Sequence, residues 1–119
     1  MPRTLESILI EAGKTIADPA KWTQGTLARD RRGNEVRPTE RRAVKFSAEG
    51  IICSVVRWKC EDENASSGVV NTAAAALATI DLMANRLFRH SSFWVNDNLG
   101  HEEVLQVFRA AVKHSRIPK

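Results

Sequence analysis

Apolar residues recur at intervals of three and four in four stretches of the chain, the spacing that places side chains on one face of a helix. This pattern predicts helices over residues 4–17, 39–60, 67–89 and 101–115. Polar residues able to cap them are Thr4, Thr39, Ser66 or Ser67, and Asp97 or Asn98. The residues 51–58 are rich in Ile, Val and Trp, so a strand is the alternative for that stretch.

Residues 20–38 depart from the helical pattern. Gly25, Gly33 and Pro38 interrupt them, and the sequence around Gly33 is typical of a turn. The flanking residues 26–28 and 35–37 could pair as a short hairpin. Residues 91–100 are expected to be a connector. The fold class is therefore mainly α: one four-helix domain over residues 1–119, with a small β-hairpin inserted at 20–38, α+β at the margin.

The net charge of the chain is concentrated in one segment. The 119 residues carry 18 Lys and Arg and 14 Asp and Glu, a formal net charge of +4. Residues 29–45 alone account for +4, so the rest of the chain sums to zero. The basic side chains of this segment are Arg29, Arg31, Arg32, Arg37, Arg41, Arg42 and Lys45. Together they predict a surface that attracts carboxylates or phosphates, and arginine favours bidentate contacts with both.

Composition and spacing argue against several function classes. No apolar run approaches the ~18 residues needed to cross a bilayer, and no signal peptide is visible, so we expect a cytoplasmic protein. The two cysteines, Cys53 and Cys60, are too few for a disulfide scaffold. No His or Cys pair has zinc-ligand spacing, no glycine-rich loop could hold a phosphate, and no pattern selects a Cys-His pair for nucleophilic catalysis. We therefore expect no metal, no cofactor and no catalytic residue.

A second candidate site combines two loop-like segments that each carry a tryptophan. Its residues are Trp22, Arg29, Asp30, Trp94, Asn96 and Asp97. If the segments meet, these side chains would form a small polar cluster beside aromatic walls, able to bind a small molecule or support catalysis. The alternative is structural: Asp97 caps the last helix, Arg29 pairs with a carboxylate, and the tryptophans fill the core.

Three motifs occur in the same order as in a known family. They are W-T-Q-G-T-L-A-R-D at 22–30 followed by Gly33, Val36 and Pro38, A-V-K-F-S-A-E-G-I-I at 43–52, and W-V-N-D at 94–97 before E-V-L-Q-V-F-R-A-A at 103–111. The set resembles an uncharacterised family of small bacterial and phage proteins, a domain of unknown function. Phe46-Ser47 stands where the family usually has Trp-Cys, and Val95 separates Trp94 from Asn96. The resemblance implies this segment layout and a mobile-element origin, and it assigns no reaction.

These observations favour a non-enzymatic binding or regulatory module that docks an acidic protein surface through the arginine-rich segment. The first alternative is nucleic-acid binding by the same segment, although only Trp22 and Phe46 flank it and no nucleic-acid-binding motif is present. The second is the small-molecule or catalytic cluster. The structural alternative is a solvated face with local pairing to Asp30, Glu35 and Glu40. Ala- and Gly-rich helix faces could also pack between chains, which leaves a homo-oligomer open.

Overall fold

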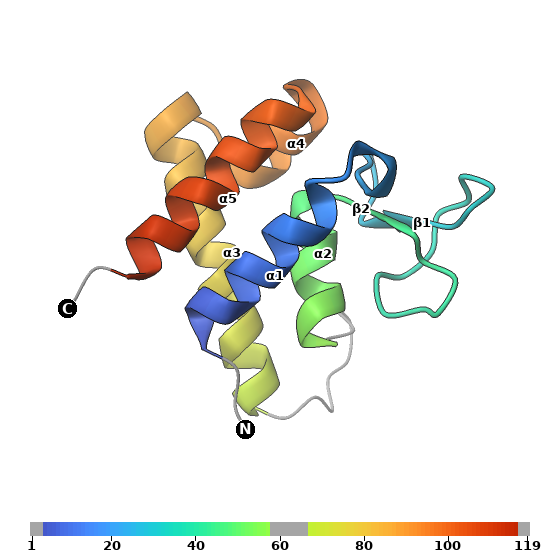
Figure 1. Cartoon of the computed structure of the whole chain (residues 1–119), viewed down its shortest axis with the longest axis horizontal. Helices are drawn as coiled ribbons and strands as arrows, with labels where there is room; N and C mark the ends of the chain where they lie inside the picture. The colour runs from blue at the N-terminus through green and yellow to red at the C-terminus, as the bar shows by residue number, and fades with distance from the viewer. Residues whose placement is uncertain (1–3, 58–66, 117–119) are drawn as a thin grey trace.

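The computed structural model describes residues 4–57 and 67–116. They form five α-helices, one 3-10 helix and a two-stranded sheet: α1 Leu5–Ile16, η1 Pro19–Lys21, β1 Ala28–Arg29, β2 Lys45–Phe46, α2 Ala48–Val56, α3 Ser67–Phe88, α4 Ser92–Asn98 and α5 His101–Ser115. The prediction of a mainly helical chain with a small β element is confirmed (Figure 1). The predicted number of four helices is wrong, because residues 91–100 contain α4 rather than only a connector.

Side-chain caps explain where several helices begin. The Thr4 hydroxyl accepts a hydrogen bond from the Ser7 amide at 3.0 Å, which confirms the predicted start of α1. The Ser91 side chain caps α4 in the same way. Helix α5 begins at His101, and Gly100 before it supplies no side-chain cap. The predicted caps, Asp97 and Asn98, instead lie inside α4, so that prediction is wrong.

The second predicted helix begins nine residues later than expected. The Ser47 hydroxyl accepts from the Gly50 amide at 3.0 Å and so starts α2 at Ala48. The preceding residues 39–46 form turns and strand β2. At the other end, Arg57 adopts a left-handed conformation with φ 57°, which stops the helix after Val56. The predicted continuation to residue 60 and the polar stretch after it fall in 58–66, outside the described residues.

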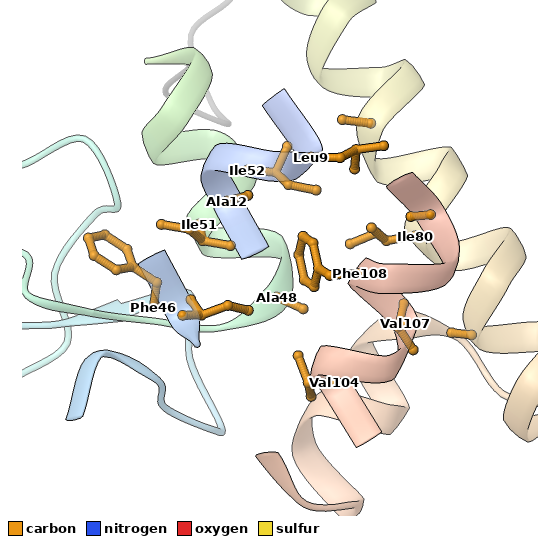
Figure 2. Packing of buried hydrophobic residues seen from close by; sticks show 14 of the residues in the cluster. Leu9, Ala12, Phe46, Ala48, Ile51, Ile52, Ile80, Val104, Val107 and Phe108 are labelled. Carbon is orange, nitrogen blue, oxygen red and sulfur yellow. The ribbon is translucent and has the colours of Figure 1, made fainter. Parts of the chain in front are cut away.

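The hydrophobic core lies where α1, α2, α3 and α5 pack together. Helix α1 packs against α2 and α5, while α3 packs against α2, α4 and α5. The buried face of α1 consists of Ile8, Leu9, Ala12 and Ile16. Figure 2 shows Phe108 of α5 among buried residues that include Leu9, Ile52 and Ile80. Within the described ranges, no helix combines the length and the apolar character needed to cross a bilayer.

The small sheet joins residues that are farther apart than the predicted hairpin. Strand β1 pairs antiparallel with β2, in the register Ala28 with Phe46 and Arg29 with Lys45. The predicted partner segment 35–37 also pairs with β1, through an antiparallel bridge between Arg29 and Glu35 and a hydrogen bond of 3.1 Å from the Val36 amide to the Ala28 carbonyl. The predicted pairing of 26–28 with 35–37 is therefore confirmed in part, but the second strand of the sheet is 45–46, with the long connection looping away from the helices (Figure 1).

Gly50 fixes this β segment against α2. A Cβ built on Gly50 would overlap the carbonyl oxygen of Leu27 and lie 2.7 Å from its carbonyl carbon. Only glycine permits so close an approach of the two backbones. The amide of Ser47 also donates to the Leu27 carbonyl oxygen at 3.0 Å. The start of α2 and the residues just before β1 therefore form one tightly packed unit.

Candidate functional site

The arginine-rich segment forms a distinct lobe, which we call the basic lobe and define as residues 29–45. Its turns lie at the far side of the sheet from the helices (Figure 1). Five of its arginine residues are exposed: Arg31, Arg32, Arg37, Arg41 and Arg42. Lys45 and Arg29 are half-buried. The lobe thus presents most of its positive charge to solvent on one part of the molecule.

Asp30 organises the first turn of the basic lobe. One of its carboxylate oxygens accepts from the backbone amides of Arg32 and Asn34, both at 2.9 Å. Its other oxygen accepts from the Asn34 side chain at 3.2 Å. Burial acts to raise the pKa of Asp30, but these hydrogen bonds, helped by the charge of Arg42, hold it below its ordinary value. The Asp30 carboxylate is therefore bonded within the turn and stabilises it.

Arg29 differs from the exposed arginines of the lobe because its guanidinium makes three hydrogen bonds, two of them to residues that precede the lobe. It donates to the Thr23 hydroxyl at 3.0 Å, the Gly33 carbonyl at 3.0 Å and the Gln24 carbonyl at 3.2 Å. These bonds tie the base of the lobe to the chain that precedes β1. Arg29 consequently acts as a structural residue, and its guanidinium is not presented for docking.

Glu40 holds the second turn. Its carboxylate accepts from the Arg37 amide at 2.6 Å and forms an exposed ion pair with Arg42 at 3.4 Å. Exposed pairs of this kind contribute at most about 1 kcal/mol, so they constrain Arg42 only weakly. Among the described residues, the side chains of Arg31, Arg32 and Arg41 form no ion pair. Two turns with internal hydrogen bonds therefore carry the exposed side chains of Arg31, Arg32 and Arg41.

Asn96 joins the two segments of the predicted ligand cluster. Its Oδ1 accepts from the Trp22 indole at 2.8 Å and from the Ala48 amide at 2.9 Å. Its Nδ2 donates to the Thr23 carbonyl and to Asp97, each at 3.1 Å. The side chain is only 2% exposed, and its hydrogen-bonding capacity is fully used. Asn96 is thus a buried connection between α4, the start of α2 and residues 22–23.

Further hydrogen bonds strengthen the same connection. The Gln24 side chain donates to the carbonyl oxygens of Asn96 and Leu99, both at 3.0 Å. The Asp97 carboxylate accepts from the Gly25 amide at 2.9 Å. The two loop-like segments therefore do meet, through residues 22–25 and α4.

The structure brings together only part of the predicted cluster. Trp22, Asn96 and Asp97 lie together, and Arg29 adjoins them through its bonds to Thr23 and Gln24. The Asp30 carboxylate is occupied within its own turn. Trp94 stacks on His90 with ring centroids 3.6 Å apart. The polar atoms that meet bond mainly to one another, which is the arrangement of a structural junction.

A cleft of about 210 Å³ lies beside this junction. Its lining residues are Thr26, Leu27, Ser47, Glu49, Phe93, Asn96 and Asp97. They come from the segment before β1, the start of α2, and α4. The Phe93 side chain is 58% exposed, which leaves an apolar surface at the cleft. Sequence reasoning placed only Asn96 and Asp97 in a candidate site.

Glu49 is the ionisable group in the cleft with a clearly perturbed environment. Burial is the largest cause and raises its pKa, and the negative charges of Asp81 and Asp97 raise it further. Among the described residues, its carboxylate has no hydrogen-bond donor and no cationic partner. In the sequence, Glu49 resembles an ordinary acidic residue of a helix first turn, so no local signal distinguishes it.

The remaining candidate chemistry is sparse. Cys53 is buried in α2, and Cys60 lies outside the described residues. Within residues 4–57 and 67–116, no three His, Cys, Asp or Glu side chains lie close enough to hold a metal ion together. His101 contributes to packing, since its Nε2–H donates to the Ile16 carbonyl and its ring contacts Trp22.

The structure defines a small helical protein with a basic lobe and a separate acidic cleft. Comparison with family models places the chain in a named group: it belongs to the Family of unknown function (DUF6197), whose model matches residues 1–114. The expected membership of an uncharacterised family is thereby confirmed. No curated protein and no solved structure matches the chain.

Proposed function

We propose that this protein is a binding or regulatory module, rather than an enzyme, and that it docks an acidic protein surface through the basic lobe. The observation that carries the proposal is the exposure of Arg31, Arg32, Arg41 and Arg42 on two turns that project from the helical body (Figure 1). A localised positive field of this kind attracts and orients a partner of opposite charge.

The construction of the lobe supports a docking role. The carboxylates of Asp30 and Glu40 accept hydrogen bonds from backbone amides, and these bonds order the turns. Because the backbone is held by these bonds, a partner would not have to order it on binding, and less conformational entropy would be lost. The arginine side chains themselves remain exposed and can form bidentate contacts with carboxylates.

An acidic protein is a better fit than single-stranded nucleic acid. Residues 29–45 contain no aromatic residue. The two flanking aromatics are engaged elsewhere, since Phe46 is only 8% exposed and the Trp22 indole bonds to Asn96. Proteins that bind single strands commonly stack bases on exposed aromatic rings, and the lobe has none to offer. Duplex binding through phosphates alone remains the competing outcome for the experiment below.

The experiment compares binding to immobilised poly-L-glutamate and to immobilised duplex DNA over a series of salt concentrations. The test variant combines Arg31→Glu, Arg32→Glu, Arg41→Glu and Arg42→Glu. A matched control makes the same charge change at exposed sites outside the lobe: Lys14→Glu, Arg86→Glu, Arg89→Glu and Lys113→Glu.

The proposal predicts that the lobe variant loses poly-L-glutamate binding while the control retains most of it. Equal losses in both variants would show that net charge alone matters and would contradict a docking lobe. Tighter lobe-dependent binding to the duplex at physiological salt, with a steep salt dependence, would instead favour nucleic acid as the partner.

A further inference from the structure

The cleft beside α4 has features that the proposed docking function does not use. It is built from the segment before β1, the start of α2, and α4, whereas the docking arginines lie in the turns of the basic lobe. Its volume of about 210 Å³ is smaller than the ~300–1,000 Å³ typical of sites for drug-sized molecules. The cleft is therefore suited to a small ligand with a short chain.

The polar wall of the cleft lacks a positive charge. Glu49 has no donor or cation near its carboxylate among the described residues, and Asp97 adds negative charge on the same wall. The visible bonds of Asp97 come from the Gly25 amide and the Asn96 side chain, which are neutral donors. A cation placed between the two carboxylates would relieve their repulsion and supply Glu49 with hydrogen bonds.

Ser47 is a second polar group of the cleft with an unmade hydrogen bond. Its side chain lines the cleft and Ser47 is only 6% exposed. The hydroxyl oxygen accepts from the Gly50 amide at 3.0 Å. Among the described residues, its hydroxyl hydrogen has no acceptor. A buried donor without an acceptor is costly, so we expect a water oxygen to accept this hydrogen in the cleft, beside any ligand.

Another part of the lining is apolar. Leu27 is half-buried and Phe93 is more than half exposed, so both can cover a hydrocarbon chain. Only one aromatic ring lines the cleft, whereas quaternary ammonium groups are usually held by several rings. A primary ammonium is the better match, because its three N–H groups can bond to separate carboxylate oxygens.

We propose that the cleft binds a small aliphatic primary amine, with the ammonium group between Glu49 and Asp97 and the hydrocarbon chain against Leu27 and Phe93. Binding requires Glu49 to be ionised. Because the ammonium group bonds to the carboxylate form, its binding favours the ionised state of Glu49, and no covalent step is involved. A metal ion is a poorer match, since among the described residues no group of three His, Cys, Asp or Glu side chains could hold one.

The test is a nuclear magnetic resonance titration of the ¹⁵N-labelled full chain with n-butylammonium chloride. The amide signals of Thr26, Glu49, Phe93 and Asp97 report on the cleft. n-Butanol in sodium chloride of equal ionic strength is the neutral comparison ligand. Glu49→Gln is the test variant, and Glu35→Gln is the matched control, because Glu35 is an exposed carboxylate of the basic lobe.

The proposal predicts saturable shifts at the cleft with butylammonium and roughly tenfold weaker binding, or none, with butanol. Glu49→Gln should weaken butylammonium binding by about the same factor, while its amide spectrum remains that of a folded protein. Glu35→Gln should bind butylammonium with the affinity of the unmodified chain. Equal binding of butanol, unchanged binding in Glu49→Gln, or no saturable shift at the cleft would each overturn it.

Discussion

Removing the Asn96 side chain should cost a large part of the stability of the fold. Substitution by alanine leaves three distant partners without their hydrogen bonds: the Trp22 indole, the Ala48 amide and the Thr23 carbonyl. A partner left unsatisfied in a buried position costs about 1–3 kcal/mol. Because some of these groups are only part-buried and can reach water, we expect Asn96→Ala to reduce the free energy of unfolding by about 3–5 kcal/mol. That is a large fraction of the ~5–15 kcal/mol typical of a domain.

Urea unfolding followed by circular dichroism measures this loss directly. Asn98→Ala is the matched control, since Asn98 is an exposed asparagine of the same helix whose side chain bonds only to the Trp94 carbonyl at 3.0 Å. The control should lose less than about 0.5 kcal/mol. If Asn96→Ala lost no more than the control, the junction between α4, α2 and residues 22–23 would not hold the fold together as described.

Three further substitutions test separate parts of the structure. Gly50→Ala forces a methyl group into the Leu27 backbone and should cost about 3 kcal/mol or more in thermal unfolding, whereas Gly13→Ala, whose Cβ would lie 3.5 Å from its nearest neighbour, should be tolerated. Burial raises the pKa of Glu49, so its ionisation opposes folding as pH rises above the ordinary glutamate range. Glu49→Gln should therefore raise the melting temperature at neutral pH and lose that advantage in acid. An equal gain at both pH values would refute the raised pKa of Glu49. Hydrogen bonds within the turn outweigh burial and lower the pKa of Asp30, so the stability that its carboxylate provides is lost as pH falls through that lowered value. Asp30→Asn should therefore be less stable than the unmodified chain at neutral pH, and its melting temperature should change less with pH in acid. Thermal melting over a pH series measures both effects.

Long helices were predictable because their buried faces follow the sequence pattern without interruption. The buried residues of α1 are the apolar positions that the spacing selects: Ile8, Leu9, Ala12 and Ile16. Helix α5 likewise occupies the predicted residues 101–115. In these elements local periodicity and tertiary packing agree, which is the condition under which sequence patterns are informative.

The beginning of α2 was not predictable from local pattern. Ala43, Val44 and Phe46 continue the apolar spacing upstream of Ser47, so the pattern extends the helix too far. Phe46 is apolar because it pairs with Ala28 in the sheet and is buried there, a contact between distant residues. Helix α4 was missed for a different reason, since seven residues are too few to establish a helical period.

The candidate site was predictable only in part. The sequence suggested that the segments of Trp22 and Asn96 could meet, and they do. The hydrogen bond between these two residues spans 74 residues of sequence, so no spacing rule predicts it. The binding of Asp30 within its own turn follows from a known tendency of aspartate and could have been expected. The environment of Glu49 depends on Asp81 and Asp97 from two other helices, so only the fold reveals it.

The proposed docking role of the basic lobe is tested most directly by capture of cellular partners. The unmodified chain, the fourfold lobe variant and the fourfold control are immobilised and exposed to nuclease-treated lysate of the source cells at physiological salt. We predict that the unmodified chain and the control capture the same acidic protein and that the lobe variant does not, with all three unfolding cooperatively. Capture of that protein by the lobe variant at undiminished yield would contradict the proposed role of Arg31, Arg32, Arg41 and Arg42.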